Sequence, residues 1–156
     1  MIAAVVVWLL QDLLQILMMG FLLVPEFFLL VVIYRVLADP AAQDRAALWI
    51  WFAFFGGIIW DFRWAETPGV SGLVNVAMLA FVSWVWERTP VGGRSVALFA
   101  ALAGGAHFFS GIAHYLAWAT PSQAAVRMFL IQQFMTVPVL IVLCAIYAFR
   151  ATDTHV

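Results

Sequence analysis

The sequence has little charge and no lysine. Only 10% of its 156 residues are charged, and all seven basic residues are arginine. A soluble domain carries about 25% charged residues. Because 67% of the residues are hydrophobic and the mean hydropathy is +1.07, too little polar surface remains to cover a water-facing globule. The composition therefore predicts an integral membrane protein, with residues 1–156 forming a single polytopic domain.

The sequence also lacks the residue groups that most enzymes need. Its one cysteine, Cys144, lies inside a hydrophobic run and has no second thiol with which to form a disulfide or bind a metal. There is no nucleophile elbow, no phosphate-binding glycine loop and no histidine pair at metal-binding spacing. The net charge of −1 gives no basis for nucleic-acid binding. We therefore expect no catalytic residues, no cofactor, no metal and no enzyme activity.

Hydrophobic runs between charged and turn-forming clusters indicate an all-α bundle of six transmembrane helices. A spanning helix needs about 20 apolar residues. The runs are approximately residues 2–20, 22–38, 45–61, 70–86, 95–118 and 123–149. The break at residues 19–25 is the weakest, and five spans result if the first two runs merge. We prefer six, because one helix over residues 2–38 would be about 55 Å long, far beyond the ~30 Å hydrocarbon core.

The arginines predict how the helices are oriented. With six spans, five arginines fall on one side and only Arg63 and Arg127 on the other. The positive-inside rule then places both termini in the cytoplasm. The turn after the third run and the start of the second helix, at Pro25 and Glu26, would face outward. Proline suits the first turn of a helix, where its missing N–H leaves no bond unmade.

Asp12 is an ionisable residue inside the first predicted span, and such residues often have a function. One interpretation makes it part of a proton or substrate path. The other, which we favour, pairs it with a polar group on a neighbouring helix or places it at the cytoplasmic end of a span that begins late.

Two histidines lie in the fifth run. His107 and His114 share one helix face with two glycines and a serine. They are about 10 Å apart along the axis, too far to hold one metal ion on a straight helix. A stripe of small and polar residues is typical of close helix packing with interhelical hydrogen bonds. A proton relay through the two rings is the alternative interpretation.

The longest polar interruption separates the third and fourth runs. Asp61 lies at the end of a helix, where the dipole disfavours a carboxylate, so it needs a partner, either Arg63 or a donor from another helix. Gly57 would allow close helix approach, and Gly69 a backbone angle that the turn requires. Asn75, in the fourth run, would help the helices pack. The turn can hold two helices in register, contact a partner, or do both.

These features together resemble a known family. The segment from Pro25 to Tyr34 precedes a Gly57-x-x-x-Asp61 motif, and Gly69 follows eight residues after the aspartate. This order resembles the rod shape-determining protein MreD family of bacteria over roughly residues 8–90. The resemblance implies a multi-pass protein of the cytoplasmic (inner) membrane, possessing an architecture like the substrate-binding subunits of energy-coupling-factor transporters.

The resemblance also implies a function. Such proteins are non-enzymatic subunits of the elongation machinery and associate with MreC, a membrane-anchored coiled-coil protein. They act indirectly with the glycosyltransferase–transpeptidase pair that builds side-wall peptidoglycan and with an actin-like filament. The alternative is the substrate-binding subunit of a vitamin-type transporter. Its pocket would use five polar residues from several helices: Asp12, Asn75, His107, His114 and Gln132.

Overall fold

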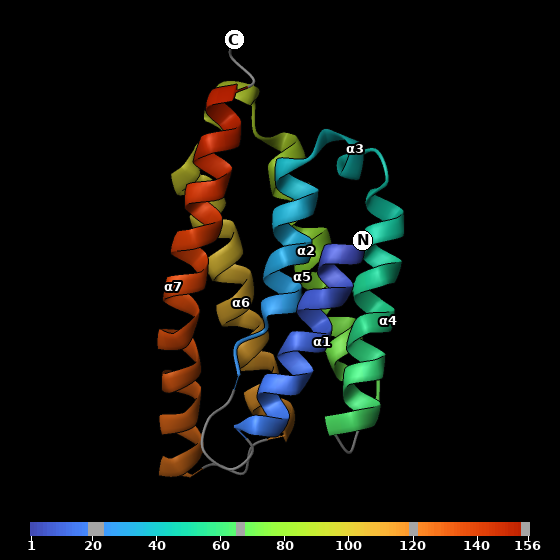
Figure 1. Cartoon of the computed structure of the whole chain (residues 1–156), viewed down its shortest axis with the longest axis vertical. Helices are drawn as coiled ribbons and strands as arrows, with labels where there is room; N and C mark the ends of the chain where they lie inside the picture. Colours follow the sequence, from blue (N-terminus) through green and yellow to red (C-terminus); the bar gives the residue numbers. More distant parts are fainter. Residues whose placement is uncertain (19–23, 65–67, 119–121, 154–156) are drawn as a thin grey trace.

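The computed structural model describes residues 1–18, 24–64, 68–118 and 122–153. These residues form helices and connecting turns, which run up and down along one long axis (Figure 1). The elements are α1 (Ile2–Leu17), α2 (Phe27–Ala38), α3 (Pro40–Gln43), α4 (Ala46–Trp64), α5 (Val70–Arg88), the 3₁₀ turn η1 (Val91–Gly93), α6 (Val96–Trp118) and α7 (Gln123–Asp153).

Four of these helices, α4 to α7, are long and apolar enough to cross a membrane, whereas α1 and α2 are shorter apolar helices. The predicted third to sixth runs therefore correspond to helices of spanning length. The first two runs do not merge into one helix, because Val24–Glu26 lie outside any helix and α1 and α2 run in opposite directions side by side (Figure 1). Of the predicted break at residues 19–25, residues 19–23 lie outside the described residues.

The second run is a helix for only part of its length. α2 has 12 residues, or about 18 Å, and the non-helical segment Val24–Glu26 precedes it. The prediction that Pro25 lies in the first turn of this helix is therefore wrong. It precedes the N-cap residue Glu26 and is buried.

α2 is the central helix of the bundle. It packs against α1, α4, α5, α6 and α7 (Figure 1). Its buried residues lie on every side of the helix: Phe28, Leu29, Leu30, Val32, Ile33, Tyr34, Val36 and Leu37. A helix that is apolar all round is expected in such an interior position. The start of α2 therefore lies among side chains from several other helices.

α4 and α5 pack closely against each other. A Cβ atom added at Gly57 would lie 2.5 Å from the backbone nitrogen of Gly72, so the two backbones approach as only glycine permits. Gly69, the N-cap of α5, has a φ of +103°, a left-handed conformation that glycine adopts without strain. Both glycines thus have the structural roles expected from the sequence.

Candidate functional site

The segment Val24–Glu26 places non-helical backbone inside the bundle, so its polar groups need partners there. The N–H of Val24 donates to Gln15 Oε1 of α1 (3.3 Å), and its carbonyl accepts from Gln132 Nε2 of α7 (3.3 Å). Pro25 has no N–H to satisfy. The N–H of Glu26 donates to His107 Nε2 of α6 (3.3 Å).

The remaining carbonyls of the segment bond to α2 itself. Pro25 accepts from the N–H of Phe27 (2.8 Å) and Glu26 from that of Leu30 (3.2 Å). The N–H of Phe28, in the first turn, donates to Gln11 Oε1 of α1 (2.8 Å). Every backbone N–H and C=O of Val24–Glu26 thus has a partner, and three other helices supply side chains for this start of α2.

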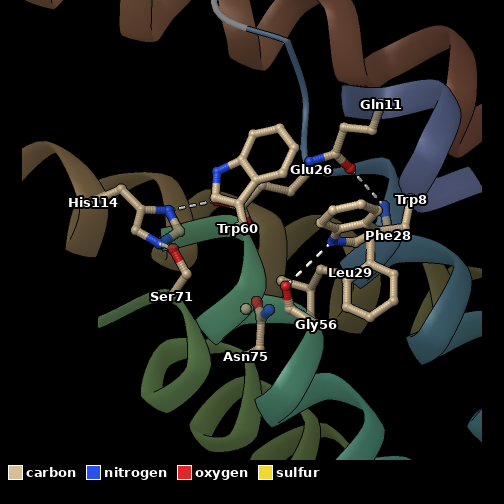
Figure 2. Close-up of a pocket in the computed structure, with 11 residues that line it drawn as sticks. Trp8, Gln11, Glu26, Phe28, Leu29, Gly56, Trp60, Ser71, Asn75 and His114 are labelled. Atoms are coloured by element: carbon tan, nitrogen blue, oxygen red, sulfur yellow. Dashed lines mark hydrogen bonds and ion pairs between the residues drawn. The ribbon is translucent and has the colours of Figure 1, made fainter. Parts of the chain in front are cut away.

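The carboxylate of Glu26 is the centre of a buried polar network. It accepts from Ser110 Oγ (2.6 Å) and pairs with His114 Nδ1 (2.5 Å). The second ring nitrogen of His114 lies 3.1 Å from Ser71 Oγ of α5. Figure 2 shows His114 between Glu26 and Ser71. Because Glu26 does not cap its own helix, its side chain instead joins α2 to α6 and, through His114, to α5.

His107 has a different set of partners from His114. Its Nε2 accepts from the Glu26 N–H, and Thr136 Oγ1 lies 3.1 Å from the same nitrogen. Its Nδ1 lies 3.2 Å from Gln133 Oε1. A backbone N–H can only donate, so Nε2 must keep its lone pair, and the ring is the neutral tautomer with the proton on Nδ1. His107 therefore holds the backbone of α2 in place from α6.

Asp61 is fully buried, with an exposed fraction of 0%. Its Oδ2 accepts from the N–H groups of Gly69 (2.8 Å) and Ser71 (2.9 Å) at the start of α5. The compensating donor therefore comes from another helix, and the alternative partner, Arg63, is wrong. Since Ser71 also contacts His114, the glycine–aspartate–glycine turn connects to the network around Glu26.

Arg63 pairs with Asp12 of α1. Its Nε lies 2.8 Å from Asp12 Oδ1, and Trp64 Nε1 donates to the same oxygen (2.9 Å). The side chain of Asp12 is only 10% exposed, that of Arg63 50%. The favoured interpretation of Asp12, pairing with a polar group on a neighbouring helix, is confirmed. The pair ties α1 to the end of α4.

A small cavity of about 30 Å³ lies beside Glu26 (Figure 2). It is large enough for one water molecule, and Gly57, Asn75 and His114 are among the residues that line it. Asn75 Nδ2 donates to the carbonyl of Ala53 in α4 (3.4 Å). Asn75 thus adds a bond to the close α4–α5 contact.

The transporter alternative placed five polar residues in one pocket, and the structure does not bring them together. His114 and Gln132 line a larger cavity, whereas Asn75 lines only the small one. Asp12 and His107 line neither of these two cavities. Within the described parts of the chain, no group of three or more histidine, cysteine, aspartate or glutamate side chains could hold a metal ion.

Sequence reasoning missed four residues of this site, Gln11, Gln15, Ser110 and Gln132, as partners of the α2 start. The available signal was their position, because each is a polar residue inside an apolar run. In lipid such residues must find partners within the protein. The sequence did not indicate that the partner of each glutamine was backbone and that of Ser110 the Glu26 carboxylate.

The described residues form a helical protein with four helices long and apolar enough to cross a membrane, and polar side chains buried between its helices bond to one another. The family model of rod shape-determining protein MreD matches residues 1–103. The chain therefore belongs to the MreD family and is a rod-shape-determining membrane protein of bacteria. Comparison with curated proteins and with solved structures gave no match.

Proposed function

We propose that this protein is a non-enzymatic scaffold subunit of the cell-elongation machinery, which binds a MreC-type coiled-coil protein in the cytoplasmic membrane. Membership of the MreD family carries this proposal. The partner would connect it indirectly to the enzyme pair that builds side-wall peptidoglycan and to the actin-like filament. The buried network supports a scaffold role, because its groups bond to one another and hold helices together.

We propose six membrane crossings, with both termini in the cytoplasm. The chain reverses direction from each of α1, α2, α4, α5, α6 and α7 to the next (Figure 1). Arg35, Arg45 and Arg88 lie near the end of the bundle that contains α3 and the C-terminal end of α7. An excess of arginine supports a cytoplasmic location for that end. The likeness to energy-coupling-factor subunits stays a prediction.

The partner's single transmembrane helix would dock in a groove between α1 and α4. This groove has a volume of about 380 Å³ and its floor includes Phe28 of α2. Val5 and Leu9 line one side, and Phe55 and Ile59 the other. The one polar group among its lining side chains, the indole N–H of Trp8, donates to the carbonyl of Gly56 (3.2 Å). A single apolar helix could therefore fill it without burying an unpaired group.

Cysteine cross-linking tests this docking site. Cys144 is first replaced by alanine, and a cysteine is then placed at Phe55, in the groove, or at Phe134 of α7, which does not line it. Both side chains are exposed, 55% and 75% respectively. We expect Phe55→Cys to cross-link to one face of the partner's transmembrane helix and Phe134→Cys not to do so. Cross-linking from Phe134→Cys but not from Phe55→Cys would show that the partner docks on α7 and not in the groove.

Deletion of the gene tests the function as a whole. We expect cells that lack the protein to lose their rod shape and to regain it when the full chain is supplied from a plasmid. Cells that stay rod-shaped after the deletion would contradict the proposed role, whatever the cross-linking shows.

A further inference from the structure

The larger cavity beside Glu26 has the size of a ligand site. Its volume is about 320 Å³, and side chains of α1, α4, α6 and α7 line it. Small-molecule sites in proteins are usually clefts of about 300–1,000 Å³ lined mainly by apolar and aromatic groups. This cavity shares Gln11, Glu26, Trp60 and His114 with the small cavity drawn in Figure 2.

The charged groups in the wall are paired with each other. The Glu26 carboxylate has both oxygens engaged, by His114 and by Ser110. A charged ligand would have to displace these short contacts or enter a low-dielectric site without a counter-charge, which is costly. The wall therefore favours an uncharged ligand.

Two glutamines leave hydrogen-bonding groups for such a ligand. Gln11 is 4% exposed, and its oxygen is fixed by the N–H of Phe28, which can only donate. Gln132 is 7% exposed, and its nitrogen is fixed by the carbonyl of Val24, which can only accept. Among the described residues, the Gln11 nitrogen and the Gln132 oxygen have no hydrogen-bond partner. Neither atom belongs to the fully buried atoms without a partner, so both are accessible from the cavity. These two buried side chains thus offer the cavity one donor and one acceptor.

The aromatic lining has no parallel walls. The rings of Trp60 and Trp64 are 6.1 Å apart at 39°, and those of Tyr115 and Phe129 are 6.1 Å apart at 55°. A flat aromatic ligand would need a slot between parallel rings, whereas a saturated ring can place its C–H face on one indole. The α7 side of the wall includes Met128, which is 38% exposed, so the polar cavity adjoins an apolar surface.

We propose that this cavity binds the uncharged, hydroxyl-bearing head group of a lipid-like molecule. The Gln11 amide would donate to a hydroxyl oxygen, the Gln132 carbonyl would accept from a hydroxyl, and the indoles would cover the apolar face of the ring. An alkyl chain on the same molecule would leave past α7 into the membrane. This binding is independent of the scaffold role and of the groove between α1 and α4.

Octyl-β-D-glucoside is the probe for this proposal, with the full chain in lipid nanodiscs. Saturation-transfer difference NMR would detect binding through the sugar protons, with empty nanodiscs as the blank for partition into lipid. We expect sugar signals above the blank. Ala125→Phe, which fills the cavity, should abolish them, whereas Ala124→Phe, at an exposed position that does not line the cavity, should leave them unchanged.

A second variant tests the hydrogen bond without filling the cavity. Gln11→Glu keeps an acceptor oxygen for the N–H of Phe28, removes the free amide donor and adds a carboxylate that an uncharged ligand does not compensate. Loss of one hydrogen bond corresponds to a roughly fivefold weaker affinity, so we expect at least that change from Gln11→Glu and none from Gln123→Glu at the exposed start of α7. Thermal unfolding of each variant shows whether it is folded.

Three results would overturn the proposal. The first is no sugar signal above the blank with the unaltered chain. The second is equal binding of the glucoside by folded Ala125→Phe and Ala124→Phe. If Ala125→Phe does not fold, undiminished glucoside binding by Gln11→Glu takes its place. The third is tighter binding of octyltrimethylammonium than of the glucoside, which would show that the cavity selects charge. Loss of the protein partner from Ala125→Phe without any glucoside binding would instead assign the cavity to that partner.

Discussion

Replacement of Asp61 by alanine removes the acceptor that holds the start of α5. Two N–H groups then lose their partner, and they differ in burial: Ser71 is 3% exposed, whereas Gly69 is partly exposed. An unsatisfied buried donor costs about 1–3 kcal/mol, and a donor that water can reach costs less. We therefore expect Asp61→Ala to lower the free energy of unfolding by about 2–4 kcal/mol.

Asp61→Asn separates the acceptor from the charge. Its amide oxygen can take the place of Oδ2 and accept from both N–H groups, so only the charge assistance is lost, about 1 kcal/mol. The NH₂ group of asparagine then takes the place of Oδ1, which is already buried without a hydrogen-bond partner among the described residues, so one unsatisfied polar group replaces another. Asparagine should thus be clearly milder than alanine.

Unfolding by sodium dodecyl sulfate, followed by tryptophan fluorescence, measures both variants. Asp44→Ala is the matched control, because Asp44 is an exposed aspartate at the other end of the bundle, and we expect it to stay within about 0.5 kcal/mol of the unaltered chain. An Asp61→Ala variant as stable as this control would refute the reasoning. If Asp61→Asn lowered the free energy of unfolding as much as Asp61→Ala, the charge and not the acceptor oxygen would be what stabilises the start of α5.

Three further substitutions test separate parts of the backbone argument. Gly57→Ala should destabilise the protein by about 1–3 kcal/mol, because its Cβ would lie 2.5 Å from backbone of α5. Its control, Gly105→Ala, has no described atom near the added Cβ and should be neutral or slightly stabilising. Equal melting temperatures of these two variants would contradict the expectation. Gly69→Ala should cost about 1–2 kcal/mol through its φ of +103° alone, since no atom of the described residues lies within 4 Å of its Cβ position. Unchanged resistance to unfolding by SDS would count against this expectation. Pro25→Ala adds a buried N–H where every backbone group already has a partner, and it should cost about 1–3 kcal/mol. Its control, Pro40→Ala, lies at the exposed start of α3 and should cost under about 1 kcal/mol. Unfolding of both variants in SDS measures the difference.

The positions of the long helices could be predicted because lipid imposes a simple rule. A run of apolar residues between charged clusters must be a helix, and α4 to α7 begin and end within a few residues of the predicted runs. The beginning of α2 could not be placed in this way. Pro25 is compatible both with the first turn of a helix and with the non-helical residues before it, and only the side chains of α1, α6 and α7 decide between them.

The partner of Asp61 could have been predicted better from helix geometry. Arg63 is two residues away, about 200° around the same helix, so the two side chains point in opposite directions. This excludes their pairing and leaves a donor from another element. The partner of Glu26 was beyond such reasoning, because Ser110 and His114 are far away in the sequence and nothing in their pattern specifies which helix they face.

The C-terminal third of the chain completes the fold that the family match defines. That match ends at residue 103, yet the groups that accept the N–H of Glu26 and bind its carboxylate are on the later part of α6, and the donor to the carbonyl of Val24 is on α7. Without them, residues 1–103 would expose an unpaired carboxylate and unpaired backbone in lipid, where each unsatisfied group costs several kcal/mol. The start of α2 can therefore lie inside the bundle only because α6 and α7 close around it.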